Sequence, residues 1–273
     1  MIGRTNKLPF NPIEWPGSPK DFTGDFNKGT CTTETVQRYV FGTRHITWDG
    51  RVMKYGHATG ECASGYGAFN LAPVNISAVL ALAVAEGDRT VTVTVTSGGY
   101  AADGEIAEDE LAGGYLIINN ATEDPQNFLI IGNDADVAVT TCKLYVDEPA
   151  WQAVAATGYS EVILNPYAHL HGDPADPVGR NCSCMGIPKR NLAATYNGWV
   201  QTWGPCWITP PNGATAPGYT DNDREVYMAQ NGSVTGGASG TVIESGYQHV
   251  GFVIEHSDAG AAGPPLVMLQ ISI

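Results

Sequence analysis

The residues best suited to bind a metal are two histidines and two cysteines that lie close together in the chain. His169 and His171 are followed by Cys182 and Cys184, and each pair has one intervening residue. That spacing places both side chains of a pair on one face of a strand, and two histidines with two cysteines satisfy tetrahedral zinc. Paired cysteines of zinc sites usually have more residues between them. We therefore expect an ordinary loop or an oxidised cysteine pair here, with no bound metal and no cofactor.

The familiar catalytic motifs are missing from the sequence. It contains no nucleophile elbow, no phosphate-binding loop and no zinc-protease motif. The carboxylates between Glu105 and Glu110 form one continuous run, whereas catalytic carboxylates face each other across a cleft, so we interpret the run as a solvated loop. Residues 221–225 have oxygen ligands of the calcium type but lack the glycine and distal glutamate of a calcium loop. We expect no catalytic residue and no enzymatic activity.

The elements that position these residues are predicted to be strands. Residues 90–96 alternate strictly between threonine and valine, which is the pattern of a half-buried strand. Asp49-Gly50 lies between two segments rich in strand formers and predicts a hairpin turn. Residues 78–85 fit either a helix or a buried strand. Further strands are predicted at residues 115–119, 127–133, 141–146, 161–167, 224–229, 248–254 and 266–273.

Residues 199–208 form the stretch around which we expect the C-terminal part to be organised. Trp199 and Trp203 alternate with Val200 and Thr202, and Trp207 follows. Aromatic side chains bury a large area each, so we expect these three tryptophans to serve as core or as an oligomer contact. Gly204-Pro205 is predicted to interrupt the strand.

The spacing of strands and turns predicts an all-β protein with two small β-barrel or sandwich domains. Strands recur at short intervals between residues 78 and 160 and indicate a barrel or sandwich of about four or five strands. The expected divisions are an extended arm, a hairpin region that packs with the C-terminal domain, a middle domain and a C-terminal domain. They cover residues 1–35, 36–77, 78–160 and 161–273.

The predicted arm is rich in proline and has aromatic residues at intervals. Proline blocks helix formation, so the segment is expected to be extended. Extended segments with spaced apolar side chains are built to lie on another surface. The four aromatic residues expected to make that contact are Phe10, Trp15, Phe22 and Phe26.

Composition excludes several classes of partner. The 273 residues carry a formal net charge of −14 with only 14 lysines and arginines, which argues against nucleic acid and against an anionic membrane surface. The first ten residues contain no apolar segment of the secretory type, so we expect synthesis in a cytosol. The six cysteines are too scattered for a disulfide framework and are expected to be reduced.

Several segments resemble virion structural proteins of tailed phages. One is a hairpin with the sequence Asp49-Gly50-Arg51, and the chain from about residue 251 is similar to lambda-type head decoration proteins. The resemblance implies a β-tulip-like C-terminal domain that sits on the capsid as a homotrimer and cements neighbouring capsomers. The matching segments are residues 41–55, 112–119, 144–149, 160–167 and 186–205.

The functional expectation is therefore a capsid decoration or cement protein. Its expected partners are the major capsid protein and further copies of itself, and its expected location is the capsid exterior after assembly in the host cytoplasm. One alternative is a tail or fibre-base component of the virion. The other is a metal-dependent or polysaccharide-acting enzyme that uses His169, His171, Cys182 and Cys184.

Overall fold

Every regular element in the described part of the chain is a β-strand, so the all-β prediction is confirmed. The computed structural model describes residues 33–47, 49–70, 76–95, 105–120, 123–136, 141–156, 158–172, 183–210, 216–219, 224–229, 231–236, 247–256 and 264–272. A search of these residues finds no helix with the length and hydropathy that crossing a membrane requires. The chain divides into two compact units, which we call the sheet unit (Met1–Ala72 and Tyr167–Ile273) and the barrel unit (Pro73–Pro166).

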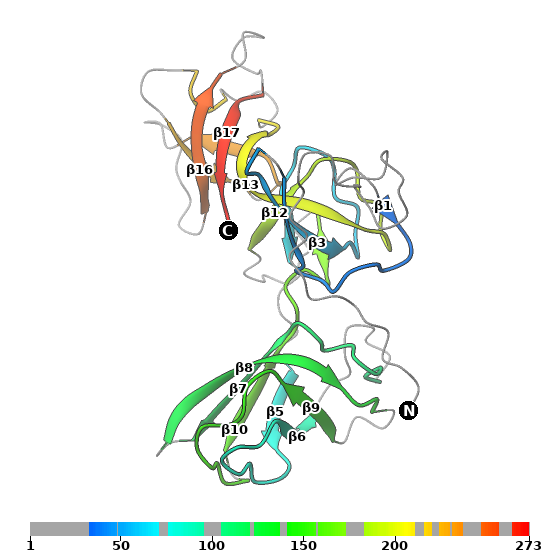
Figure 1. Ribbon diagram of the computed structural model, residues 1–273. Coiled ribbons are helices and arrows are strands. Elements are labelled where there is room, and N and C mark those ends of the chain that lie inside the picture. Colours follow the sequence, from blue (N-terminus) through cyan, green and yellow to red (C-terminus); the bar gives the residue numbers. More distant parts are fainter. Residues whose placement is uncertain are drawn as a thin grey trace. The chain divides into compact units, whose positions relative to one another are not determined.

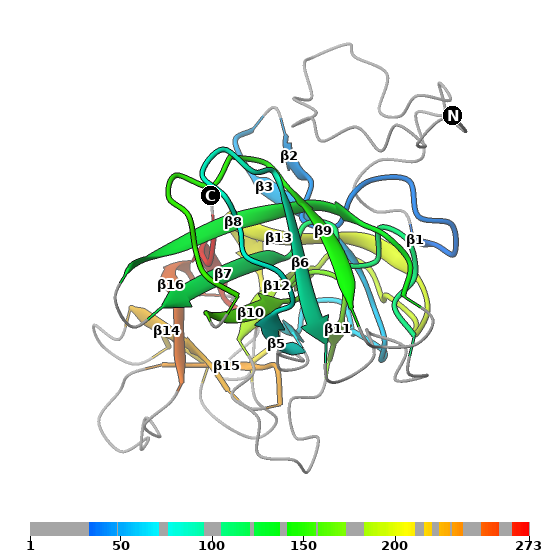
Figure 2. The same cartoon turned by 90° about the horizontal axis from the view of Figure 1, so that it is seen from below.

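The barrel unit is a closed antiparallel barrel in the strand order β10-β5-β6-β9-β8-β7. These strands make up the cyan and green body of Figure 1, and the long β8 is strongly curved in Figure 2. Residues 78–85, which fit helix or strand in the sequence, overlap with strand β5. The bounds are β5 (Ile76–Leu80), β6 (Thr90–Val95), β7 (Tyr115–Asn120), β8 (Glu123–Asn133), β9 (Cys142–Val146) and β10 (Tyr159–Ile163).

Strand alternation explains how the barrel obtains its core. In β6, Val91, Val93 and Val95 are buried, while the three threonines between and before them are half-buried. The valines pack with inward residues of the other strands, such as Leu116 and Leu144. Closure leaves the barrel without free strand edges, which would otherwise promote aggregation.

The barrel is inserted between two paired strands of the sheet unit, and the first and last strands of the barrel are also paired with each other. Its first and last strands, β5 and β10, are antiparallel neighbours, with Ile76 opposite Val162. The strands of the sheet unit that flank it, β4 (Ala68–Asn70) and β11 (Leu170–His171), are also antiparallel neighbours, with Asn70 opposite Leu170. Paired ends allow a domain to be inserted without disturbing the domain that receives it.

The sheet unit is built on one sheet of 11 strands whose main path is β11-β4-β12-β13-β17-β16-β14-β15. Three strands lie off this path: β1 and β3 pair with β13, and β2 pairs with β3. The bounds are β1 (Thr33–Glu34), β2 (Arg44–Ile46), β3 (Val52–His57), β12 (Cys184–Pro188), β13 (Asn197–Trp207), β14 (Glu225–Met228), β15 (Val234–Gly236), β16 (Gln248–Glu255) and β17 (Leu266–Gln270).

Strand β13 joins strands β1, β3 and β12 to strand β17 and the strands beyond it. It pairs with β1, β3, β12 and β17 along its length, and Figure 1 shows it passing from β3 and β12 to β17. The prediction that Gly204-Pro205 interrupts the strand is wrong, because β13 continues through both residues. Gly204 absorbs the bend with a φ of +90°, a conformation that glycine adopts readily, and Pro205 stays in register opposite Met268.

The buried side of β13 is aliphatic rather than aromatic. Val200 belongs to one buried cluster of the sheet unit, with Leu170 and Leu192, and Cys206 belongs to another, which contains residues of β14, β16 and β17. The tryptophans lie on the other side: Trp199 and Trp203 are half-buried and Trp207 is 53% exposed. The outer face of β13 therefore presents aromatic surface. The predicted arm residues Phe10, Trp15, Phe22 and Phe26 lie outside the described residues.

Candidate functional site

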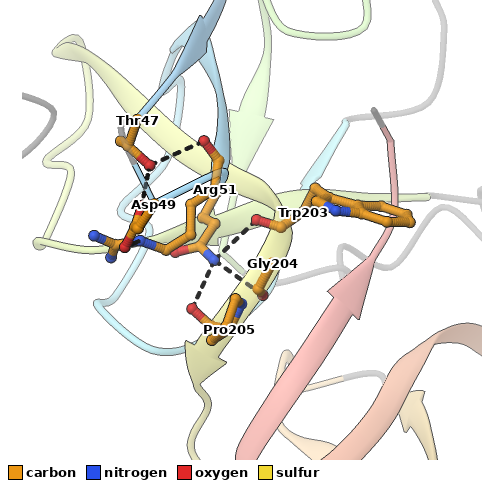
Figure 3. A network of polar contacts seen from close by, with 7 residues as sticks. Thr47, Asp49, Arg51, Trp203, Gly204 and Pro205 are labelled. Carbon is orange, nitrogen blue, oxygen red and sulfur yellow. Dashed lines mark hydrogen bonds and ion pairs between the residues drawn. The ribbon is translucent and has the colours of Figure 1, made fainter. Parts of the chain in front are cut away.

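The bend of β13 is held by one buried amide. Gln201 is almost completely buried, and its Nε2 donates to the carbonyl oxygens of Trp203 (3.1 Å), Gly204 (3.1 Å) and Pro205 (2.9 Å). Figure 3 shows these three carbonyl groups converging. Carbonyl groups that are wholly or partly buried need donors, so this side chain stabilises the backbone at the bend.

The Asp49-Gly50 hairpin turn packs against the same bend. A Cβ atom at Gly204 would lie 2.9 Å from Cγ of Arg51, so the two chains approach closely. Arg51 Nε donates to Asp49 Oδ2 at 2.7 Å, and the Thr47 hydroxyl donates to the other Asp49 oxygen. Partial burial of Asp49 acts to raise its pKa, but the hydrogen bonds from Arg51 and Thr47 and the charge of Arg51 lower it to about 2.

An aromatic cluster covers the neighbouring part of the sheet. Trp199 lies 5.3 Å from Tyr39, 5.5 Å from His45 and 5.2 Å from Tyr55, measured between ring centroids. Tyr55 is buried, whereas the other three are half-buried. We define these four residues as the aromatic cluster. Edge-on and tilted contacts of this kind stabilise the cluster internally, and the partly exposed rings offer apolar surface to a partner.

The structure separates the members of the predicted metal site that it describes. His171 and Cys184 lie on opposite sides of Phe69, because β11 and β12 both pair with β4 at that residue. Burial raises the pKa of the Cys184 thiol to about 12. Burial, together with the nearby His57, lowers the pKa of His169 to about 4. Among the described residues, which do not include Cys182, there is no group of three or more metal-binding side chains.

The outer surface of the barrel is both acidic and apolar. Residues 73–166 contain 14 acidic and two basic residues, a net charge of −12 out of −14 for the whole chain. Exposed apolar residues face outward in cross-strand pairs, Tyr115 with Leu129 and Tyr159 with Val79. Exposed apolar patches of this kind are typical of surfaces that contact another protein.

In the part of the chain that the structure describes, these features do not assemble a metal site. Comparison with protein-family models, curated proteins and solved structures found no match. Sequence reasoning selected Trp199 and Trp203 but missed Gln201, whose role depends on the bend beside it. It also missed Arg44 and Lys54, which become neighbours only when β2 and β3 pair.

Proposed function

We propose that this chain is a virion structural protein of a tailed phage. In this proposal it binds the outer surface of the capsid as a homotrimer and stabilises the shell. It acts by making many copies of the same contact. Weak contacts that recur over a symmetric shell add up through effective concentration. The major capsid protein is the proposed partner, and the N-terminal arm is the proposed anchor.

One observation carries the proposal: the segments on which the resemblance rests are neighbours in space. The hairpin of residues 41–55 pairs with the segment of residues 186–205 through β3 and β13. Arg51 from the first segment packs against Gly204 from the second. In the barrel, the segments of residues 112–119 and 160–167 pair as β7 and β10. Sequence features that lie far apart in the chain therefore belong to shared structural units, which supports a resemblance of whole units rather than of isolated motifs.

The test is binding to capsids of the phage that encodes the chain. Purified protein is mixed with shells that lack it, and bound protein is measured by co-sedimentation over a range of concentrations. The proposal expects saturable binding and a higher temperature of shell disruption. Binding that does not saturate, or that leaves the shell no more stable, contradicts it. Localisation to the tail in particle images would favour the tail or fibre-base alternative.

The arm is tested with matched tryptophan variants. Trp15→Ala removes an aromatic residue of the arm, and Trp151→Ala removes an exposed aromatic residue of the barrel. If the arm anchors the protein, Trp15→Ala weakens capsid binding by about tenfold or more, as expected for a buried aromatic anchor, while Trp151→Ala does not. Equal affinity of the two variants would refute the anchoring role of the arm.

A further inference from the structure

Two cations face each other on the edge of the sheet unit. Arg44 of β2 lies directly opposite Lys54 of β3. Tyr55 N donates to Thr43 O at 3.0 Å and Thr47 N donates to Arg51 O at 2.9 Å. Because hydrogen-bonded and non-hydrogen-bonded pairs alternate along antiparallel strands, Arg44 and Lys54 form a pair of the second type, in which side chains are closest. Like charges in this position are destabilising.

The chain itself does not compensate this pair within the part that the structure describes. Arg44 Nε is buried and has no hydrogen-bond partner. Burial lowers the pKa of Lys54, and the charge of Arg44 lowers it further. No described carboxylate lies within ion-pair distance of either side chain. An uncompensated cation of this kind is costly, so the pair is better suited to receiving an anion than to stabilising the fold.

The position of the pair makes it accessible to a partner. Arg44 and Lys54 are both half-buried rather than enclosed. Strand β2 pairs with β3 alone among the described strands, so the outward backbone groups of Arg44 and Ile46 lie along the free edge of the sheet. An approaching segment can therefore meet both the cations and the edge of the strand.

The strongest concentration of carboxylates in the chain is at one end of the barrel unit. The segment with Glu105 and Glu108 is joined to the segment that follows β8 through reciprocal backbone hydrogen bonds between Ile106 and Asp136 (3.0 and 2.8 Å). Burial raises the pKa of the Cys142 thiol to about 12, and the negative charges of Asp136, Asp134 and Glu110 contribute to the rise. We define the acidic end as Glu105, Glu108, Asp109, Glu110, Asp134 and Asp136.

We propose that Arg44 and Lys54 bind carboxylates of the acidic end of a second copy of the chain. The sheet unit has a net charge of −2 and the barrel unit −12, so contact between two barrels is repulsive, whereas contact between a barrel and this cationic pair is attractive. Each copy offers two different surfaces, and such head-to-tail contacts form a ring when the rotation between neighbouring copies closes, as it does in a trimer. The inference deepens the proposed function by naming the contact that forms the homotrimer.

The first test measures oligomeric mass without any capsid, by light scattering after size exclusion. Wild-type protein is expected to be a trimer whose dissociation constant rises with salt between about 0.05 M and 0.5 M. Arg44→Glu with Lys54→Glu should yield monomers. The control reverses two other charges at exposed positions, Arg190→Glu with Arg224→Glu, and should remain trimeric. A monomeric wild type, or a trimeric double variant of the pair, overturns the proposal.

A charge exchange within one chain gives the decisive result. Glu105→Lys with Glu108→Lys should abolish association, and adding Arg44→Glu with Lys54→Glu to the same chain should restore the trimer. Misfolding cannot produce that restoration, because it requires the two surfaces to recognise each other. Failure of the combined variant to associate, while it melts cooperatively, counts against the pairing.

A final variant separates binding from folding. Lys54→Met keeps the aliphatic stem of the side chain but removes the repulsion, so the monomer should melt at a higher temperature while its association weakens by at least about tenfold. A purely structural lysine would lose stability instead. If the pair variants keep the trimer but lose capsid binding, the partner of Arg44 and Lys54 is the capsid and the present proposal is wrong. A wild-type protein that forms the trimer through the pair but does not bind capsids contradicts only the proposed function.

Discussion

At the scale of single residues, Gln201 has the most demanding role in the structure. Its one Nε2 group serves three backbone carbonyl oxygens at the bend of β13. Gln201→Leu keeps the size of the side chain but leaves three backbone acceptors, one of them in a buried contact, without that donor, which should lower the free energy of unfolding by about 1–3 kcal/mol. Chemical denaturation measures the change. Gln270→Leu, at an exposed position opposite Trp203, is the matched control and should change stability by less than about 0.5 kcal/mol. Equal effects of the two variants would contradict the assigned role.

His169 predicts how stability depends on pH. Burial and the charge of His57 lower its pKa to about 4, from 6.5. Since the folded chain holds this ring neutral, the unfolded chain binds more protons between those values, and stability falls as the pH drops from about 6.5 towards 4. With allowance for its partial exposure, the contribution is about 2 kcal/mol. His169→Gln should flatten the stability curve in this window, as measured by denaturation at several pH values. Parallel curves for variant and wild type would show that His169 is not responsible.

At the scale of elements, β6 allows a test with two neighbouring substitutions of nearly equal size. Val93→Thr places a hydroxyl in the barrel core, where Val93 is completely buried, and should cost about 1–3 kcal/mol. Thr92→Val places a methyl group on the half-buried outer side and should be neutral within about 0.5 kcal/mol. Thermal unfolding of the two variants measures the difference. If both substitutions lower the stability by similar amounts, the assignment of one buried and one outer face to β6 is wrong.

The elements that the sequence predicts correctly are those with a local signal. The threonine and valine alternation gives β6, and Asp49-Gly50 gives the turn before β3. Strands β4, β11 and β15 were missed, because two or three residues are too few to show a period. The expectation of a loop around His171 and Cys184 was wrong, because these residues lie in β11 and β12. The bend at Gly204 was misread as a break. The amide that stabilises the bend belongs to Gln201, and that contact is visible only in the folded chain. The pairing of Arg44 with Lys54 was not visible either, because the alignment of two strands depends on the fold and not on either segment alone.

At the scale of the whole molecule, the charge is divided unequally between the two units. The barrel unit holds a net charge of −12 in 94 residues, and the sheet unit −2 in the rest. Repulsion within the barrel lowers its stability at low salt, and added salt screens that repulsion. We therefore expect two unfolding transitions in this protein. As salt is added, the midpoint of the barrel transition should rise by more than that of the sheet unit.

The barrel unit is expected to fold as a separate protein. Its sheet is closed, its buried residues form one cluster of their own, and its first and last strands pair with each other. Residues 73–166 expressed alone should therefore unfold cooperatively, with a stability of about 5 kcal/mol, at the lower end for small domains. The complementary chain, with a short glycine-serine linker in place of the barrel, should also fold, because β4 and β11 remain paired beside the linker. Calorimetry of both pieces and of the whole chain measures this, and each piece should reproduce one of the two transitions of the whole. The prediction is contradicted if the whole chain unfolds in a single transition and the isolated barrel is unfolded. That result would mean that the barrel needs contacts with the sheet unit in order to fold.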